Sequence, residues 1–133
     1  MQAVTWLAIG VGGAVGAIAR HELNSFVSHL SIGRHFPAGI FIINVLGSAL
    51  IGLLGGALAV GRLNLSEHTR TVLVVGLLGG FTTFSSFSLD TLALFRSRHY
   101  GLALWNSAGQ VVISFAAVWL GFRVGASGPP PSM

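Results

Sequence analysis

The chain has 133 residues, of which 53% are hydrophobic and only 8% are charged, and its mean hydropathy is +0.81. A soluble domain carries about a quarter charged residues, so water is the wrong solvent for most of this surface. The net charge of +4 rests on scattered arginines, which argues against nucleic-acid binding, and the lack of cysteine excludes a disulfide framework, a zinc–cysteine site and a thiol nucleophile.

Four apolar stretches are each long enough to cross a bilayer, which takes about 20 residues in a helix. In chain order they are residues 3–26, 36–60, 69–95 and 100–125. The connections are short and polar, and Pro37 stands where the start of a helix tolerates proline. We predict an all-α membrane protein of four transmembrane helices, in which residues 1–126 form a single domain and residues 127–133 a disordered, proline-rich tail.

The first span also has one feature of a cleavable signal, because Ala17-Ile18-Ala19 resembles a signal-peptidase site. However, Met1-Gln2 provides no basic segment before the apolar run, and small residues interrupt that run. We therefore expect a retained first helix.

The arginines divide almost evenly between the two ends of such a bundle. Arg20, Arg34, Arg96 and Arg98 lie at one end, and Arg62, Arg70 and Arg123 at the other. Orientation in a membrane normally follows an excess of positive residues on one face. The near balance predicts insertion in both orientations and antiparallel pairing of two copies. The alternative is that one decisive charge or a partner protein fixes the topology.

Glycines recur at the spacing that lets helices approach closely. The pairs are Gly12 and Gly16, Gly52 and Gly56, and Gly76 and Gly80. Because packing drives helix association in lipid, this abundance favours an oligomer, with ordinary packing inside one chain as the alternative.

The third span contains the segment Gly79-Gly80-Phe81-Thr82-Thr83 at membrane depth. Adjacent glycines followed by β-branched threonines weaken a helix. We predict that the third helix is broken at its centre here and that the unwound turn frees carbonyl groups for a hard cation such as sodium. The alternative is a continuous helix whose hydroxyl groups bond back to the preceding turn.

Beyond this segment, an aromatic stripe runs beside a hydroxyl stripe. Phe81, Phe84 and Phe87 recur every three residues, as do Ser85 and Ser88, while Thr83, Ser86 and Asp90 follow at three and four. Such rings commonly pack in a core. Beside hydroxyl donors they can also line a narrow path for an anion, because ring edges carry partial positive charge.

Two other spans supply uncharged polar groups. Asn44 is a lone amide in the second span and needs a partner, either as a bond between helices or as part of an ion path. Asn106, Gln110 and Ser114 fall on one face of the fourth span at intervals of four. These donors outnumber the charges inside the spans, which suits permeation more than catalysis.

Arg20 follows the apolar part of the first span and serves either as an interface anchor or as an attractor of anions into a vestibule. The histidines show no metal-ligand spacing. The sequence contains no Ser-His-Asp order, no phosphate loop and no paired carboxylates, so we do not expect an enzyme.

Three motifs together resemble the Fluc (CrcB) family of fluoride channels. They are residues 12–20 (GGAVGAIAR), 44–48 (NVLGS) and 79–88 (GGFTTFSSFS). The likeness covers nearly the whole chain except the tail. It implies a dual-topology homodimer in the cell (inner) membrane that exports toxic fluoride passively through two antiparallel pores.

The resemblance also implies roles for particular residues. It places along each pore Asn44, Phe84, Phe87, Ser85, Ser86, Asn106, Gln110 and Ser114. It makes Arg20 the vestibule arginine, and it implies a structural sodium at the dimer centre, held by the main-chain carbonyls of Gly79 and Thr82.

The sequence departs from the family pattern at three positions. Ile40 stands where members often have threonine, Asn106 where some have tyrosine, and Asp90 where the family has a glutamate. The roles of these three residues are left open.

Two alternative functions remain at this point. One is a small dual-topology transporter of cationic drugs, which needs a carboxylate inside the membrane. Glu22, Glu67 and Asp90 all lie toward the ends of spans, which counts against it. The other is a subunit of an obligate heterodimeric fluoride channel.

Overall fold

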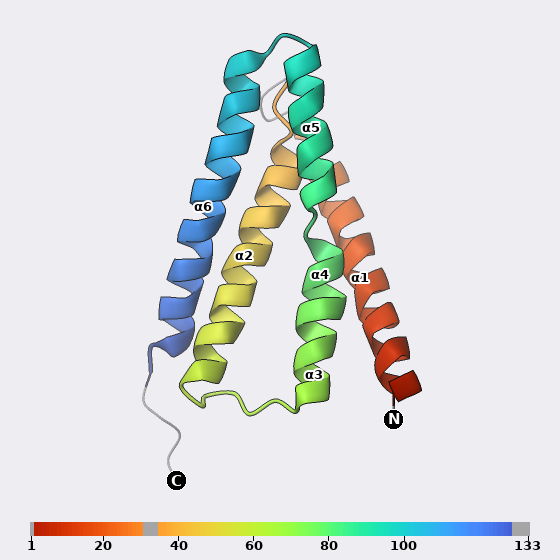
Figure 1. Cartoon of the computed structure of the whole chain (residues 1–133), viewed down its shortest axis with the longest axis vertical. Coiled ribbons are helices and arrows are strands. Elements are labelled where there is room, and N and C mark those ends of the chain that lie inside the picture. Colours follow the sequence, from red (N-terminus) through yellow and green to blue (C-terminus); the bar gives the residue numbers. More distant parts are fainter. Residues whose placement is uncertain (1, 31–34, 129–133) are drawn as a thin grey trace.

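The computed structural model describes residues 2–30 and 35–128, which form a bundle of long helices joined by short connections (Figure 1). Helix α1 spans Gln2–His29, α2 spans Ala38–Ala59 and α6 spans Tyr100–Ala126. The third crossing is built from α3 (Glu67–Thr71), the π-helical η1 (Val72–Leu78), α4 (Gly79–Phe81) and α5 (Phe84–Arg96). In the described ranges, four helical segments are long and apolar enough to cross a membrane, as the sequence predicts.

Polar groups at the ends of these segments define where they start and stop. Pro37 immediately precedes α2. The Ser66 hydroxyl accepts a hydrogen bond from the Thr69 amide at 3.1 Å and caps α3. At the end of α6, the Arg62 guanidinium donates to the carbonyls of Gly125 at 3.2 Å and Ser127 at 2.6 Å. Such terminal carbonyls lack partners inside their own helix, so Arg62 supplies them.

The last helix ends at Ala126, which is where the predicted domain ends. Of the predicted tail, the structure describes Ser127 and Gly128, and residues 129–133 lie outside the described residues.

Helices α2 and α6 pack against each other along their length, and they lie side by side in Figure 1. Glycine makes this approach possible on both helices, at Gly52 and Gly56 of α2 and at Gly121 and Gly125 of α6. A Cβ atom at Gly56 would stand 2.8 Å from the backbone nitrogen of Ala126, closer than packing allows. The two backbones are therefore in direct contact.

Helix α1 makes a similar contact with η1 and α4. Gly12 and Gly16 face this segment from α1, while Gly76 and Gly80 face α1 in return. All three glycine pairs noted in the sequence thus serve contacts within one chain. Their spacing is explained by intrachain packing and carries no information about an oligomer.

A small apolar core lies where α2 meets α5. Ile40, Ile43 and Phe87 are buried together, with Leu23 and Phe81 packed against them. Ile40 is 9% exposed, so the residue that departs from the family pattern contributes to this core and not to a polar surface. The core anchors the start of α5 beside the interruption of the third crossing.

Candidate functional site

The third crossing is interrupted at Thr82 and Thr83, which are extended, with φ and ψ of −87° and 157° and of −155° and 120°. The prediction of a broken third helix is confirmed. The predicted break also included the glycine pair, and that part is wrong, because Gly79 keeps helical angles of −64° and −37°. Extended backbone suits β-branched threonine, whereas Gly80 provides room for the Gly13 backbone of α1.

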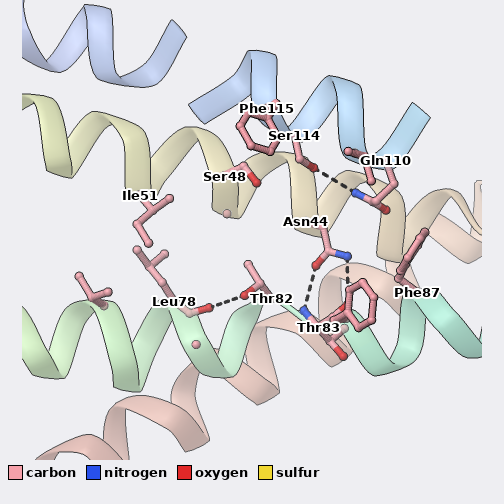
Figure 2. Close-up of a pocket in the computed structure, with 15 residues that line it drawn as sticks. Asn44, Ser48, Ile51, Leu78, Thr82, Thr83, Phe87, Gln110, Ser114 and Phe115 are labelled. Carbon is pink, nitrogen blue, oxygen red and sulfur yellow. Dashed lines mark hydrogen bonds between the residues drawn. The ribbon is translucent and has the colours of Figure 1, made fainter. Parts of the chain in front are cut away.

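Asn44 of α2 closes the interruption by pairing with the backbone of Thr83. Its Nδ2 donates to the Thr83 carbonyl at 3.0 Å, and its Oδ1 accepts from the Thr83 N–H at 2.9 Å (Figure 2). This amide therefore makes the structural bond between helices that the sequence left as one of two possibilities. Asn44 retains a second N–H, and its side chain also borders a hollow described below.

Thr83 also caps the start of α5. Its Oγ1 accepts from the Ser86 amide at 3.2 Å, and it lies 3.2 Å from the Ser86 hydroxyl and 3.1 Å from that of Ser85. Because one hydroxyl serves the first turn of the helix, α5 can restart directly after two extended residues.

The interruption changes the partners of two carbonyl groups. In a continuous helix the Thr83 N–H would bond to the Gly79 carbonyl, but here it bonds to Asn44. The Thr82 N–H and Oγ1 both donate to the Leu78 carbonyl at 3.0 Å. The Thr82 carbonyl accepts a long contact of 3.4 Å from Nη1 of Arg20. Gly79 and Thr82 thus present oxygen atoms of the kind that hard cations prefer.

An open hollow of about 460 Å³ lies beside the interruption, between α2, the third crossing and α6 (Figure 2). Its lining consists of Asn44, Gly47, Ser48, Ile51, Val74, Leu78, Gly79, Thr82, Thr83, Phe84, Phe87, Gln110, Val111, Ser114 and Phe115. The walls are mostly apolar, and the polar groups are amides, hydroxyls and backbone. No lining residue carries a charge. We call this space the central hollow.

The two phenylalanines of the central hollow differ in their surroundings. Their rings are 5.4 Å apart between centroids and tilted by 51°. Phe87 is 9% exposed and belongs to the apolar core, whereas Phe84 is 78% exposed in the single chain. The ring of Phe84 is therefore available for a contact outside this chain.

The predicted polar seam on the fourth span divides into two parts. Gln110 donates to the Ser114 hydroxyl at 3.2 Å, and both residues line the central hollow. The Oε1 atom of Gln110 is buried without a partner among the described residues. Asn106 is 1% exposed and donates to the Thr91 hydroxyl at 2.8 Å, away from the hollow lining.

Seven of the residues singled out from the sequence therefore meet at the central hollow: Asn44, Gly79, Thr82, Phe84, Phe87, Gln110 and Ser114. Ser85, Ser86, Asn106 and Arg20 do not line it. Sequence reasoning placed Thr83 in the predicted break and in the hydroxyl stripe, and it gave no site role to Ser48. Ser48 lies four residues after Asn44, which puts both on one helix face, and this spacing could have identified it.

Comparison with known proteins identifies the family of this chain. The family model described as CrcB-like protein, Camphor Resistance (CrcB), matches residues 7–122. A relative from Nitrobacter hamburgensis, named fluoride-specific ion channel FluC 2, is 41% identical over 91% of this chain and 96% of its own. Proteins named fluoride-specific ion channel FluC are 44% identical in Methylobacterium radiotolerans, over 95% and 87% of the two chains, and 45% identical in Gluconobacter oxydans, over 91% and 84%. The chain is therefore a member of the CrcB-like family, a multi-pass membrane protein by its four spans.

Proposed function

We propose that this protein is a fluoride-specific channel of the cell membrane, which lets fluoride leave the cell passively and so relieves its toxicity. The names of the relatives support fluoride as the ion. The observation that carries the proposal for this chain is the central hollow, where uncharged hydrogen-bond donors lie beside aromatic rings inside a membrane-spanning bundle.

The donors of the central hollow fit a small, strongly hydrated anion. Fluoride must exchange the hydrogen bonds of water for others, and the Ser114 hydroxyl and the second N–H of Asn44 can provide them. Gln110 orients Ser114 by donating to its hydroxyl oxygen. The ring edges of Phe84 and Phe87 add partial positive charge without a full cation that would hold the ion in place. Since no lysine or arginine lines the hollow, an anion can pass without forming an ion pair.

The central hollow is open in the single chain, which supports a second copy as its cover. Phe84 and Phe115 are 78% and 74% exposed at its rim. An antiparallel copy would place equivalent surfaces on both sides and would generate two oppositely directed pores. The near-even arginine distribution supports insertion in both orientations.

We propose in addition that a structural sodium sits where the two copies meet, held by the carbonyls of Gly79 and Thr82. One chain supplies two such oxygens, and the antiparallel partner would supply two more, which suits an oxygen-liganded hard cation. The diverted Thr83 N–H supports this role, because it leaves the Gly79 carbonyl without its usual helical donor.

The alternative functions have less support. A drug exporter needs an acidic group within the membrane, and Asp90 lies only six residues from the end of α5. The relatives' names support a channel, whether the chain pairs with itself or with another subunit.

The direct test uses the purified full chain in liposomes loaded with potassium fluoride. Valinomycin carries potassium across the membrane, so fluoride can leave without building up an opposing membrane potential. A fluoride electrode measures the fluoride that leaves. We expect rapid fluoride release that protein-free vesicles do not show, and little release when potassium chloride replaces the fluoride salt and chloride is measured. Fluoride release equal to that of protein-free vesicles would refute the channel.

A further inference from the structure

A second hollow, of about 220 Å³, lies farther along α5, between the α5–α6 turn and the segment that leads into α2. We call it the outer hollow. Its lining consists of His35, Phe36, Pro37, Asp90, Ala93, Leu94, Ser97 and His99. Asp90 follows Phe87 by three residues on α5, so the two lie on the same face of the helix. The two hollows therefore follow one another along the same helix.

The outer hollow contains an acidic group that lacks a compensating donor. The Oδ2 atom of Asp90 is buried and has no hydrogen-bond partner among the residues that the structure describes. An ionised carboxylate at this place repels an approaching anion. A channel for fluoride with this side chain in its path needs a positive group close by.

Two imidazoles provide such a group. The rings of His35 and His99 are stacked, with centroids 4.5 Å apart and planes 23° from parallel. A proton on one of the two rings balances the charge of Asp90, and a second proton on the other ring makes the outer hollow positive. Two positive charges at this separation repel each other, and a bound anion offsets that repulsion by attracting both.

Among the described residues, no other charged side chain lines the outer hollow. The titratable side chains in the lining come one each from the segment before α2, from α5 and from the turn before α6: His35, Asp90 and His99. Arg96 and Arg98 are exposed and do not line the space. The described residues also contain no group of three His, Cys, Asp or Glu side chains placed to hold a metal ion, which argues against a metal centre here.

We propose that the outer hollow is an anion-binding antechamber, in which protonated His35 and His99 offset Asp90 and donate hydrogen bonds to fluoride on its way to the central hollow. This inference rests on the proposed fluoride conduction. It makes fluoride uptake by the pore proton-assisted, because an imidazole is positively charged only in its protonated form.

The test compares fluoride release from liposomes at about pH 6 and about pH 8, because histidine side chains generally change their charge over this range. We expect release through the unaltered protein to rise roughly threefold or more at the lower pH, because the positive antechamber concentrates the anion. The double variant His35→Asn, His99→Asn should lose this rise. Asp90→Asn should raise release at the higher pH, since the outer hollow then holds no carboxylate that repels the anion.

A matched control is His29→Asn, an exposed histidine at the end of α1 that does not line the outer hollow. It should keep the pH dependence of the unaltered protein. Protein-free vesicles measured at both pH values correct for hydrogen fluoride that crosses the lipid itself.

A binding measurement keeps the test valid if the double variant does not assemble. In the unaltered protein, fluoride should move the ¹⁵N imidazole titrations of His35 and His99 to higher pH, because ligand and proton binding are reciprocally coupled. Unmoved titrations, or an unchanged pH ratio in a conducting double variant, would overturn the antechamber. Absence of fluoride release from the unaltered protein would instead overturn the proposed function.

Discussion

The side-chain amide of Asn44 replaces a helical partner for the backbone of Thr83, 39 residues later in the chain. It donates to the carbonyl at 3.0 Å and accepts from the N–H at 2.9 Å. Inside a membrane no water can satisfy these backbone groups, so an interruption of a helix survives only where protein supplies both bonds. Asn44 thereby joins α2 to the break and holds the central hollow in shape.

Replacing Asn44 by leucine, which has a similar volume, should therefore destabilise the protein. Both backbone groups of Thr83 would remain buried without partners, at about 1–3 kcal/mol each. Thermal unfolding in detergent, followed by tryptophan fluorescence, should show a lower midpoint, and fluoride release should fall with it. Asn106→Leu removes one bond to a hydroxyl, that of Thr91, and should cost less. Equal midpoints for Asn44→Leu and the unaltered protein would contradict the bridging role.

The two phenylalanines should separate stability from conduction. Phe84→Ile should reduce fluoride release with little change in the folding of the single chain, because its ring is 78% exposed there. Phe87→Ile should reduce both, since the ring packs with Ile40 and Ile43. Reshaping a packed core in this way costs about 1–3 kcal/mol. Fluoride release and the unfolding midpoint should be measured on the same preparations of each variant. If release is undiminished in both variants, the two rings do not line the route of the ion.

Glycine at the α2–α6 contact should tolerate no side chain. At Gly56 an added Cβ meets backbone atoms of α6, which cannot rotate away, so Gly56→Val should separate the helices and reduce the yield of folded protein. The matched control is Gly101→Ala in α6, where an added Cβ meets nothing within 4 Å. Size-exclusion profiles of the two variants provide the comparison. A folded Gly56→Val protein with an unchanged midpoint would show that the contact is looser than described.

Dual topology can be measured directly because the chain has no cysteine. Asn64→Cys places a single thiol in the connection between α2 and α3, where Asn64 is exposed. In intact cells, a thiol reagent that cannot cross the membrane should label about half of the molecules if both orientations are equally populated. Labelling of nearly all molecules or of none would instead show a single orientation.

Sodium should stabilise the assembled protein if the carbonyls of Gly79 and Thr82 hold it. A ligand that binds the folded state alone raises stability by RT ln(1 + [L]/Kd), so a concentration of 100 times Kd adds about 2.7 kcal/mol. Replacement of sodium by N-methylglucamine should lower the unfolding midpoint and promote dissociation of the dimer. An identical midpoint in both salts would count against the sodium site.

The sequence also predicted part of the polar lining of the central hollow. The spacing of Gln110 and Ser114 placed both on one face of the fourth helix, and both line the central hollow. The same spacing included Asn106, which bonds instead to Thr91 on α5. Helical periodicity specifies a face, but a face is broader than a single hollow, and the neighbouring helix decides which part of it is covered.

The membrane spans and their boundaries followed from the sequence alone, because transfer of a 20-residue apolar helix into lipid depends on local composition. The position of the break did not follow from the sequence. Glycine has a low helix propensity, yet Gly79 and Gly80 stay helical because α1 packs against this segment, and the extended residues are Thr82 and Thr83. That choice depends on Asn44 reaching across from α2, a contact that only the tertiary structure creates.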